Sequence, residues 1–202
     1  MELKIPPQPA GPIPFPSGKK YKILLADPPW TFKSWSKKGT GRSADQHYDV
    51  MTLDDICSLP VADLMEKDSV LFLWTTWSSL CAQEPFKVIE AWGFKAKCCG
   101  FLWRKLSSTG AKPHMGMGFY TRTDSEPCIL ATRGKPGRPI DMSIRQVIEA
   151  PVREHSRKPE GIHERIDRLY SGPKLELFAR QRRPGWDVWG NEVDKYTAEK
   201  GI

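Results

Sequence analysis

A short apolar run that stops at two prolines constrains the fold of this 202-residue chain more than any other feature. Residues 21–26 read YKILLA, and Asp27-Pro28-Pro29-Trp30 follows directly. A run of this length, rich in Ile and Leu, is typical of a strand buried on both faces. The prolines must end it, because they carry no backbone N–H for a sheet. Ligands of open α/β sheets bind beyond the carboxyl ends of such strands, so we expect residues 27–30 at a ligand site.

The tetrapeptide at 27–30 combines a carboxylate, a stiff backbone with free carbonyls and a large aromatic ring. These groups suit a planar base that carries an amine. The alternative is an ordinary proline turn with Trp30 in the core. Because Trp is rare, the whole tetrapeptide is expected by chance in roughly one in a few thousand chains of this size, which favours the functional interpretation.

Composition indicates one domain and no metal site. The length suffices for a full core, no segment approaches a membrane-spanning helix, and we expect no signal peptide. The five cysteines and four histidines have no metal-ligand spacing. We expect the cysteines to be reduced thiols, mostly in or near the core of a cytoplasmic protein.

The net charge of +7 is concentrated in loops. The basic groups are Lys33, Lys37, Lys38 and Arg42, then Arg104, Lys105 and Lys112, then Arg133, Lys135 and Arg138. A basic surface attracts polyanions, although charge alone describes an ordinary solubilising surface equally well. The chain also has eight tryptophans, many for its length, and aromatic rings beside basic groups hold single strands and flipped bases. The combination favours a nucleic-acid partner.

Strand and helix signals alternate along the chain, which predicts an α/β sandwich with a mostly parallel sheet. Strands are expected at 21–26, 69–75, 97–104, 127–132, 146–150, 174–179 and 186–189. Helices are expected from Leu53 behind a Thr52 cap, from a Ser78 or Ser79 cap to about Trp92, and from Pro159 to about Tyr170.

One domain is expected over residues 20–193, between a Pro-rich arm at 1–19 and a tail at 194–202. The loops at 31–50, 105–124 and 133–144 are long for a compact domain, and long loops tend to be functional or disordered.

Three later segments carry weaker signals. Lys158 precedes a helix start, which is a natural anion site. Glu176 lies near the end of an expected strand and can accept a ribose hydroxyl pair. Asn191 follows Gly190 and offers both a donor and an acceptor. Each also has an ordinary interpretation, such as a solvated lysine. The absence of a glycine-rich nucleotide loop counts against a dehydrogenase or an NTPase.

Taken in order, these segments resemble the DPPW-type adenine-N6 methyltransferases. That family includes the catalytic subunit of the messenger-RNA adenosine methyltransferase and shorter bacterial and phage relatives. The matching blocks are ADPPW at 26–30, HY at 47–48, VLFLWTT at 70–76, SRKP at 156–159, ELFAR at 176–180 and WGNE at 189–192. The resemblance covers about residues 21–193, and the compact length is similar to the bacterial or phage DNA adenine methyltransferase branch.

The resemblance implies a Rossmann-like fold with helices on both faces, a permuted motif order and S-adenosyl-L-methionine as cofactor. The residues that it assigns to the cofactor are Asp27, Lys158, Glu176, Phe178, Arg180, Asn191 and Glu192. Those that it or the basic loops assign to the substrate are Tyr48, Glu126, Lys33, Arg104 and Lys105. Glu192 departs from the amide that the family has there. Gln181, Arg182 and Arg183 also differ from the Pro-His-Asn of the messenger-RNA enzyme.

The four residues Asp27, Pro28, Pro29 and Trp30 are then the catalytic candidates. The Asp27 carboxylate and the Pro28 carbonyl are expected to accept the two amine protons of adenine, while Trp30 or Tyr48 stacks on the base.

Several alternatives remain open. The acceptor can be RNA instead of DNA, or cytosine or a glutamine side chain instead of adenine. The chain can also be an inactive nucleic-acid-binding partner. It can act as a monomer or a homodimer, or with a different subunit, and no membrane association is expected.

Overall fold

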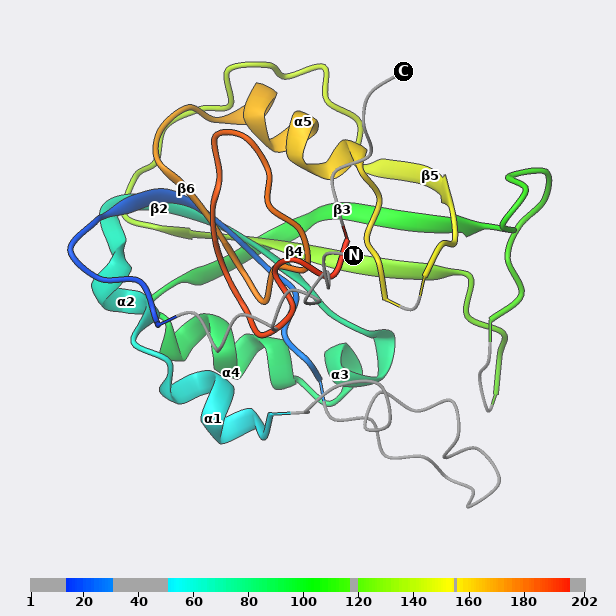
Figure 1. The fold of residues 1–202 in the computed structure, drawn as a ribbon, viewed down its shortest axis with the longest axis horizontal. Helices are drawn as coiled ribbons and strands as arrows, with labels where there is room; N and C mark the ends of the chain where they lie inside the picture. The colour runs from blue at the N-terminus through cyan, green and yellow to red at the C-terminus, as the bar shows by residue number, and fades with distance from the viewer. Residues whose placement is uncertain (1–13, 31–50, 117–119, 155, 197–202) are drawn as a thin grey trace, which may run out of the picture.

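One seven-stranded sheet forms the centre of the molecule (Figure 1). The structure, a computed structural model, describes residues 14–30, 51–116, 120–154 and 156–196. The strands are β1 (Tyr21–Ala26), β2 (Met65–Trp74), β3 (Lys95–Leu106), β4 (Ser125–Arg133), β5 (Val147–Pro151), β6 (Lys174–Leu177) and β7 (Asp187–Trp189). Their spatial order is β5-β3-β4-β2-β1-β6-β7. All seven predicted strands are present, with β2, β3 and β4 longer and β6 and β7 shorter than expected.

The sheet is mostly parallel, as predicted. β1 pairs in parallel with β2 and β6, β6 with β7, and β3 with β5. Only β4 runs against its neighbours β2 and β3. β1 lies inside the sheet, and its side chains Ile23 to Ala26 are buried on both faces. This burial explains why the strand reads as a continuous apolar run.

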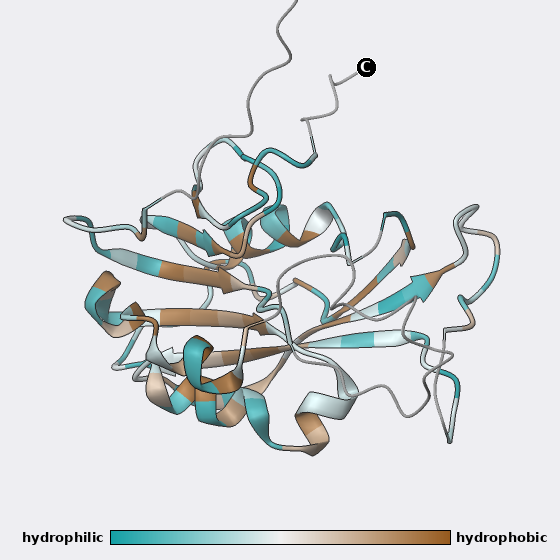
Figure 2. Ribbon diagram, turned by 60° about the horizontal axis from the view of Figure 1, so that its bottom comes forward, coloured by the Kyte–Doolittle hydropathy of each residue, from teal (hydrophilic) through white to brown (hydrophobic). Residues whose placement is uncertain are grey.

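Helices cover both faces of the sheet (Figure 1). On one face lie α1 (Leu53–Ser58), α2 (Val61–Leu64), α3 (Trp77–Cys81) and α4 (Glu84–Ala91), and on the other lies α5 (Gly161–Leu169). Leu24 and Leu71 pack toward the four-helix side, whereas Leu25 and Phe72 pack toward α5. Adjacent residues of a strand thus pack into the hydrophobic cores on opposite faces of the sheet. Figure 2 shows the hydrophobic residues concentrated in the strands between the two helical layers.

The predicted single helix over residues 78–92 is wrong. Two helices replace it, and Thr76, not Ser78 or Ser79, caps the first by accepting the Ser79 N–H at 3.1 Å. Gln83 then adopts a left-handed φ of 62°, and Pro85 stands in the first turn of α4. In one continuous helix, Pro85 would remove a hydrogen bond and clash with the preceding turn.

The expectation that most cysteines are in or near the core is also wrong. Only Cys128 is buried, whereas Cys81, Cys98 and Cys99 are exposed. Cys98 and Cys99 lie in the first half of β3, which is exposed. The described residues contain no helix able to span a membrane and no group of three side chains able to hold a metal.

Candidate active site

One edge of the sheet collects most of the predicted functional residues. Parallel strands bring their carboxyl ends to the same edge, which places Asp27 after β1, Glu176 in β6 and Lys105 near the end of β3. Because β4 is antiparallel, its beginning joins them and contributes Glu126. A site can therefore form here from residues that are far apart in the chain.

Asp27, Glu126 and two lysines form a partly buried ion cluster at this edge. Lys158 Nζ lies 2.7 Å from Asp27 Oδ2 and 2.7 Å from Glu126 Oε1. The second lysine, Lys105, places its Nζ 2.8 Å from Glu126 Oε2. With every group ionised, the two ammonium groups balance the two carboxylates. Mutual pairing of this kind is what allows charged groups to be withdrawn from water.

Burial and pairing act differently on the two acids. Burial raises the pKa of the Asp27 carboxyl, and the charge of Lys158 opposes this rise without cancelling it. Burial also acts to raise the pKa of Glu126, but the Lys158 and Lys105 ammonium groups outweigh it and lower that pKa to about 2. For Lys158, desolvation is outweighed by Asp27 and Glu126, so its pKa is raised. Glu126 and Lys158 are therefore charged at neutral pH, and Asp27 is the easier of the two acids to protonate.

The Asp-Pro-Pro-Trp turn has a fixed internal geometry. The backbone N–H of Trp30 donates to the Pro28 carbonyl at 2.8 Å, so one lone pair of that carbonyl is already used. The indole N–H of Trp30 donates to the Trp74 carbonyl at 3.0 Å, and its ring is buried in the four-helix core. This position does not suit stacking on a base, which was expected of Trp30 or Tyr48, and Tyr48 lies outside the described residues. The Trp30 indole instead ties the end of β1 to the end of β2.

A pocket opens beside Asp27, and five of the predicted cofactor residues line it: Asp27, Lys158, Glu176, Phe178 and Arg180. Asn191 and Glu192 are not in its walls. Asn191 is exposed, and Glu192 lies 3.3 Å from Arg180 and 2.6 Å from Lys195. Glu192 therefore contacts the pocket only through Arg180.

The turn after β6 shapes one wall of the pocket. Phe178 has a left-handed φ of 62°, which is uncommon for a residue with a side chain and is often found at functional sites. Its ring packs edge-on against Trp189, with centroids 5.5 Å apart. Gly190 passes so close that a Cβ there would lie 2.8 Å from the Ala179 carbonyl oxygen. The two turns that follow β6 and β7 are thus packed backbone to backbone.

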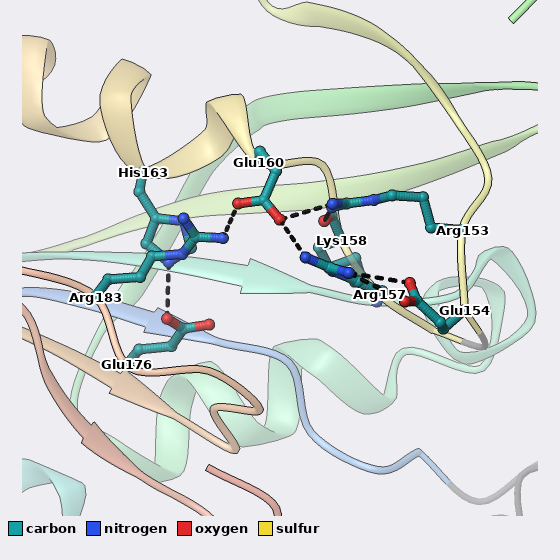
Figure 3. Close-up of polar contacts among 8 residues, drawn as sticks. All are labelled: Arg153, Glu154, Arg157, Lys158, Glu160, His163, Glu176 and Arg183. Carbon is teal, nitrogen blue, oxygen red and sulfur yellow. Dashed lines mark hydrogen bonds and ion pairs between the residues drawn. The ribbon is translucent and has the colours of Figure 1, made fainter. Parts of the chain in front are cut away.

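Figure 3 shows a second polar network on the loop that carries Lys158. Glu160 accepts from Arg153 at 2.7 Å, from Arg157 at 2.9 Å and from Arg183. Arg153 also donates to the Lys158 carbonyl at 2.8 Å. Burial acts to raise the pKa of Glu160, but Arg153 and Arg183 lower it to about 2. Through Arg183, these hydrogen bonds connect the loop that carries Lys158 to the segment after β6.

Sequence reasoning missed several residues that line or support the pocket. Arg157, Arg183 and Tyr196 line it, and His163 bonds to Glu176. Arg157 stands beside Lys158 in the SRKP block, which was the available signal. Tyr196 falls in the predicted tail, yet its N–H donates to the Arg180 carbonyl and its ring lies 4.7 Å from the Arg157 guanidinium. No sequence signal placed it there.

The predicted substrate residues divide into three groups. Glu126 and Lys105 lie in the ion cluster with Asp27. Arg104 points elsewhere and pairs with Glu149 of β5 at 2.8 Å, since neighbouring residues of a strand face opposite sides. Lys33 and Tyr48 lie outside the described residues.

Comparison with known proteins decides the family. The MT-A70 family model matches residues 21–192. The chain belongs to the MT-A70 family. This MT-A70 protein is 29% identical over 192 residues to the Type II methyltransferase M.MunI of Mycoplasma sp., a match that covers 87% of this chain and 78% of that protein.

Eukaryotic members of the MT-A70 family match as well. The N(6)-adenosine-methyltransferase catalytic subunit METTL3 of Homo sapiens is 28% identical over 182 residues. The N(6)-adenosine-methyltransferase MT-A70-like protein of Arabidopsis thaliana is 29% identical over 180 residues. Both matches cover about 87% of this chain but only 28% and 24% of the relatives, so the chain spans about a quarter of their length. The predicted adenine-N6 methyltransferase family is thereby confirmed, and the match with M.MunI is consistent with its compact bacterial or phage branch.

Proposed function

We propose that this MT-A70 protein transfers a methyl group from S-adenosyl-L-methionine to the N6 amine of adenine in DNA. The observation that carries the proposal is the position of Asp27. Its carboxylate stands at the carboxyl end of β1 and at the pocket, and Lys158 holds it at 2.7 Å. Methyl transfer to an amine needs such a fixed acceptor next to a cofactor pocket.

The chemistry of the pocket fits S-adenosylmethionine. Glu176 offers a carboxylate oxygen, Oε1, that has no protein partner within the described ranges, which suits a ribose hydroxyl. Lys158 and Arg180 supply positive charge for a carboxylate, and Phe178 supplies an aromatic face. Bound there, the cofactor supplies a methyl group on a positively charged sulfur.

Asp27 is suited to orient the acceptor amine. Its Oδ2 is held by Lys158, while Oδ1 has no partner among the residues that the structure describes. Oδ1 can accept one amine proton, and the remaining lone pair of the Pro28 carbonyl can accept the other. Both bonds direct the nitrogen and draw its protons away from it, which stabilises the positive charge that develops during transfer.

The match over 78% of the length of a Type II methyltransferase supports DNA as the polymer, since the adenosine methyltransferases match over about a quarter of their length only. An adenine in duplex DNA must leave the stack to reach Asp27, and unpairing it costs a few kcal/mol. The acidic Glu126 and basic Lys105 beside Asp27 form the polar side of the proposed acceptor pocket.

The test supplies methyl-labelled S-adenosylmethionine together with unmethylated DNA and RNA, each in single-stranded and duplex form. Labelled nucleosides are then identified by mass spectrometry after digestion. N6-methyladenine in DNA supports the proposal. Label confined to RNA identifies the RNA alternative, and label on cytosine or on protein overturns the acceptor. A chain that binds the cofactor but transfers nothing would be an inactive partner. Asp27→Asn serves as the matched inactive control.

A further inference from the structure

A histidine that lies outside the ion cluster holds one oxygen of Glu176. His163 stands in the first turn of α5, and its Nε2 lies 2.7 Å from Glu176 Oε2 (Figure 3). Both side chains are largely buried, with 12% and 18% of their surface exposed. A carboxylate can only accept hydrogen bonds when ionised, so Nε2 must carry the hydrogen of this bond.

Trp186 limits the orientation of the His163 ring. The two rings meet edge to face, with centroids 5.0 Å apart and an angle of 85° between their planes. Trp186 is itself buried. The other ring nitrogen, His163 Nδ1, is buried and has no hydrogen-bond partner among the described residues. A hydrogen on Nδ1 would therefore lack an acceptor, which favours the tautomer with its hydrogen on Nε2.

This arrangement fixes the direction of the Glu176 carboxylate. Glu176 projects from β6 toward α5, because its neighbours Leu175 and Leu177 face the four-helix core. With Oε2 held by His163, Oε1 remains for the pocket, and Oε2 keeps a second lone pair. Two acceptor sites of one carboxylate match the two hydroxyls of a vicinal diol.

We propose that His163 is a positioning residue, which sets Glu176 for the vicinal diol of the cofactor ribose. The proposal rests on the proposed function, because it takes Glu176 as the ribose-binding acid. It goes further in assigning the selectivity for a ribose over a deoxygenated sugar to the His163–Glu176 pair. A residue that only packs α5 against the sheet would affect all ligands of the pocket equally.

Binding measurements on the full chain separate the two roles. Isothermal titration calorimetry gives the Kd of S-adenosylhomocysteine and that of its 2′,3′-dideoxy analogue. The wild-type protein should bind the first ligand at least about tenfold more tightly, since its two hydroxyls can donate to a charged group. His163→Phe should bring the ratio of the two Kd values close to one, mainly by weakening S-adenosylhomocysteine.

Two amide variants sharpen the test. In His163→Gln the side-chain amide nitrogen can reach the position that Nε2 occupies in the wild type. This variant should therefore restore the wild-type ratio of the two Kd values. In His163→Asn the same amide is one carbon shorter and should fail to restore it. Glu164→Gln is the control, since Glu164 lies on the same helix with 76% of its side chain exposed. The control should leave both Kd values unchanged.

Failure of the positioning role can be distinguished from failure of the proposed function. If the wild-type protein binds neither ligand, the cofactor assignment itself is wrong. If it binds both ligands equally, or if His163→Phe and His163→Asn keep the wild-type ratio, the positioning role is overturned. An equal loss for both ligands also overturns it in favour of packing. Thermal unfolding of each variant identifies a folding defect, and the Gln and Asn pair decides the question if His163→Phe does not fold.

Discussion

Lys158 Nζ lies 2.7 Å from Asp27 Oδ2, although 131 residues separate the two in the chain. The same ammonium reaches Glu126 Oε1 at 2.7 Å. One cation thus joins the end of β1, the beginning of β4 and the loop before α5. Only 11% of the Lys158 side chain is exposed, so these contacts are formed largely out of water. Lys158 therefore both stabilises the site and positions Asp27.

Asp27→Asn should abolish most methyl transfer and leave the fold intact. The amide has the same size, but it presents an N–H where the carboxylate accepts, and it has no charge to stabilise the amine nitrogen. The rate constant for transfer should fall by about 10²–10³ or more, as for other removed transition-state contacts. Single-turnover kinetics with labelled S-adenosylmethionine measure it. Retention of more than a tenth of the wild-type rate would contradict the assigned role.

Lys158→Met should destabilise the protein strongly, and more so at alkaline pH. Removing one partner of a buried ion pair costs about 3–5 kcal/mol, because it leaves the other charge unpaired. Glu126 has a folded pKa of about 2, below its ordinary value of 4.5. Its stabilising contribution is therefore present above pH 4.5 and is lost as the pH falls toward 2.

Urea unfolding of the wild type and Lys158→Met at pH 5 and pH 8 measures this. The difference in unfolding free energy should be larger at pH 8, where both carboxylates are ionised and only Lys105, which contacts Glu126, remains of the two cations. Lys19→Met is the control, because Lys19 forms an exposed pair with Asp187 and should cost less than about 1 kcal/mol. Equal losses in the two variants would refute the interpretation of the cluster.

The position of Asp27 could be predicted from the sequence because its signals are local. A buried strand must be apolar, and two prolines must end it, so the order of the residues alone places Asp27 at the sheet edge. The sequence left two environments open for Trp30, the core and the face of a base, and could not choose between them. The environment of Trp30 depends on the Trp74 carbonyl and on the packing of distant helices, which no short pattern contains.

The pairing of Glu126 with Lys158 shows the same limit. Its proximity to Asp27 follows from the antiparallel direction of β4, and strand direction is a property of the whole topology. His163 illustrates a signal that was present but not used. The alternation of Leu175, Glu176 and Leu177 places Glu176 on the side of α5, where a polar residue of that helix must meet it.

Glu126→Gln should shift the acid limb of the pH–rate profile to lower pH. Burial raises the pKa of Asp27, and the negative charge of Glu126 adds to that rise. Replacing Glu126 by an amide removes the neighbouring negative charge. The Lys158 ammonium group then forms its ion pair with Asp27 only. Both changes favour ionised Asp27, so its pKa should fall. If transfer requires the carboxylate, kcat/KM should persist at lower pH than in the wild type.

The prediction is tested by the pH at which the acid limb of the profile lies. The maximal rate does not test it, since Glu126 can also contact the acceptor. Glu149→Gln is the control because Glu149 forms an exposed pair with Arg104. It should leave the limb unmoved. A limb that stays in place or moves to higher pH in Glu126→Gln would show that Asp27 does not govern it.

Gly190→Ala should destabilise the protein and weaken cofactor binding, whereas Gly161→Ala should not. A Cβ at residue 190 would stand 2.8 Å from the Ala179 carbonyl oxygen and 2.9 Å from the Ala179 nitrogen, so the backbone must move. Overpacking of this kind costs about 1–3 kcal/mol. A Cβ at Gly161, in contrast, meets nothing within 4 Å, and Ala favours the first turn of α5. Unfolding curves and calorimetric Kd values for S-adenosylhomocysteine compare the two variants. Similar stabilities would show that the close packing of the turns after β6 and β7 does not shape the pocket.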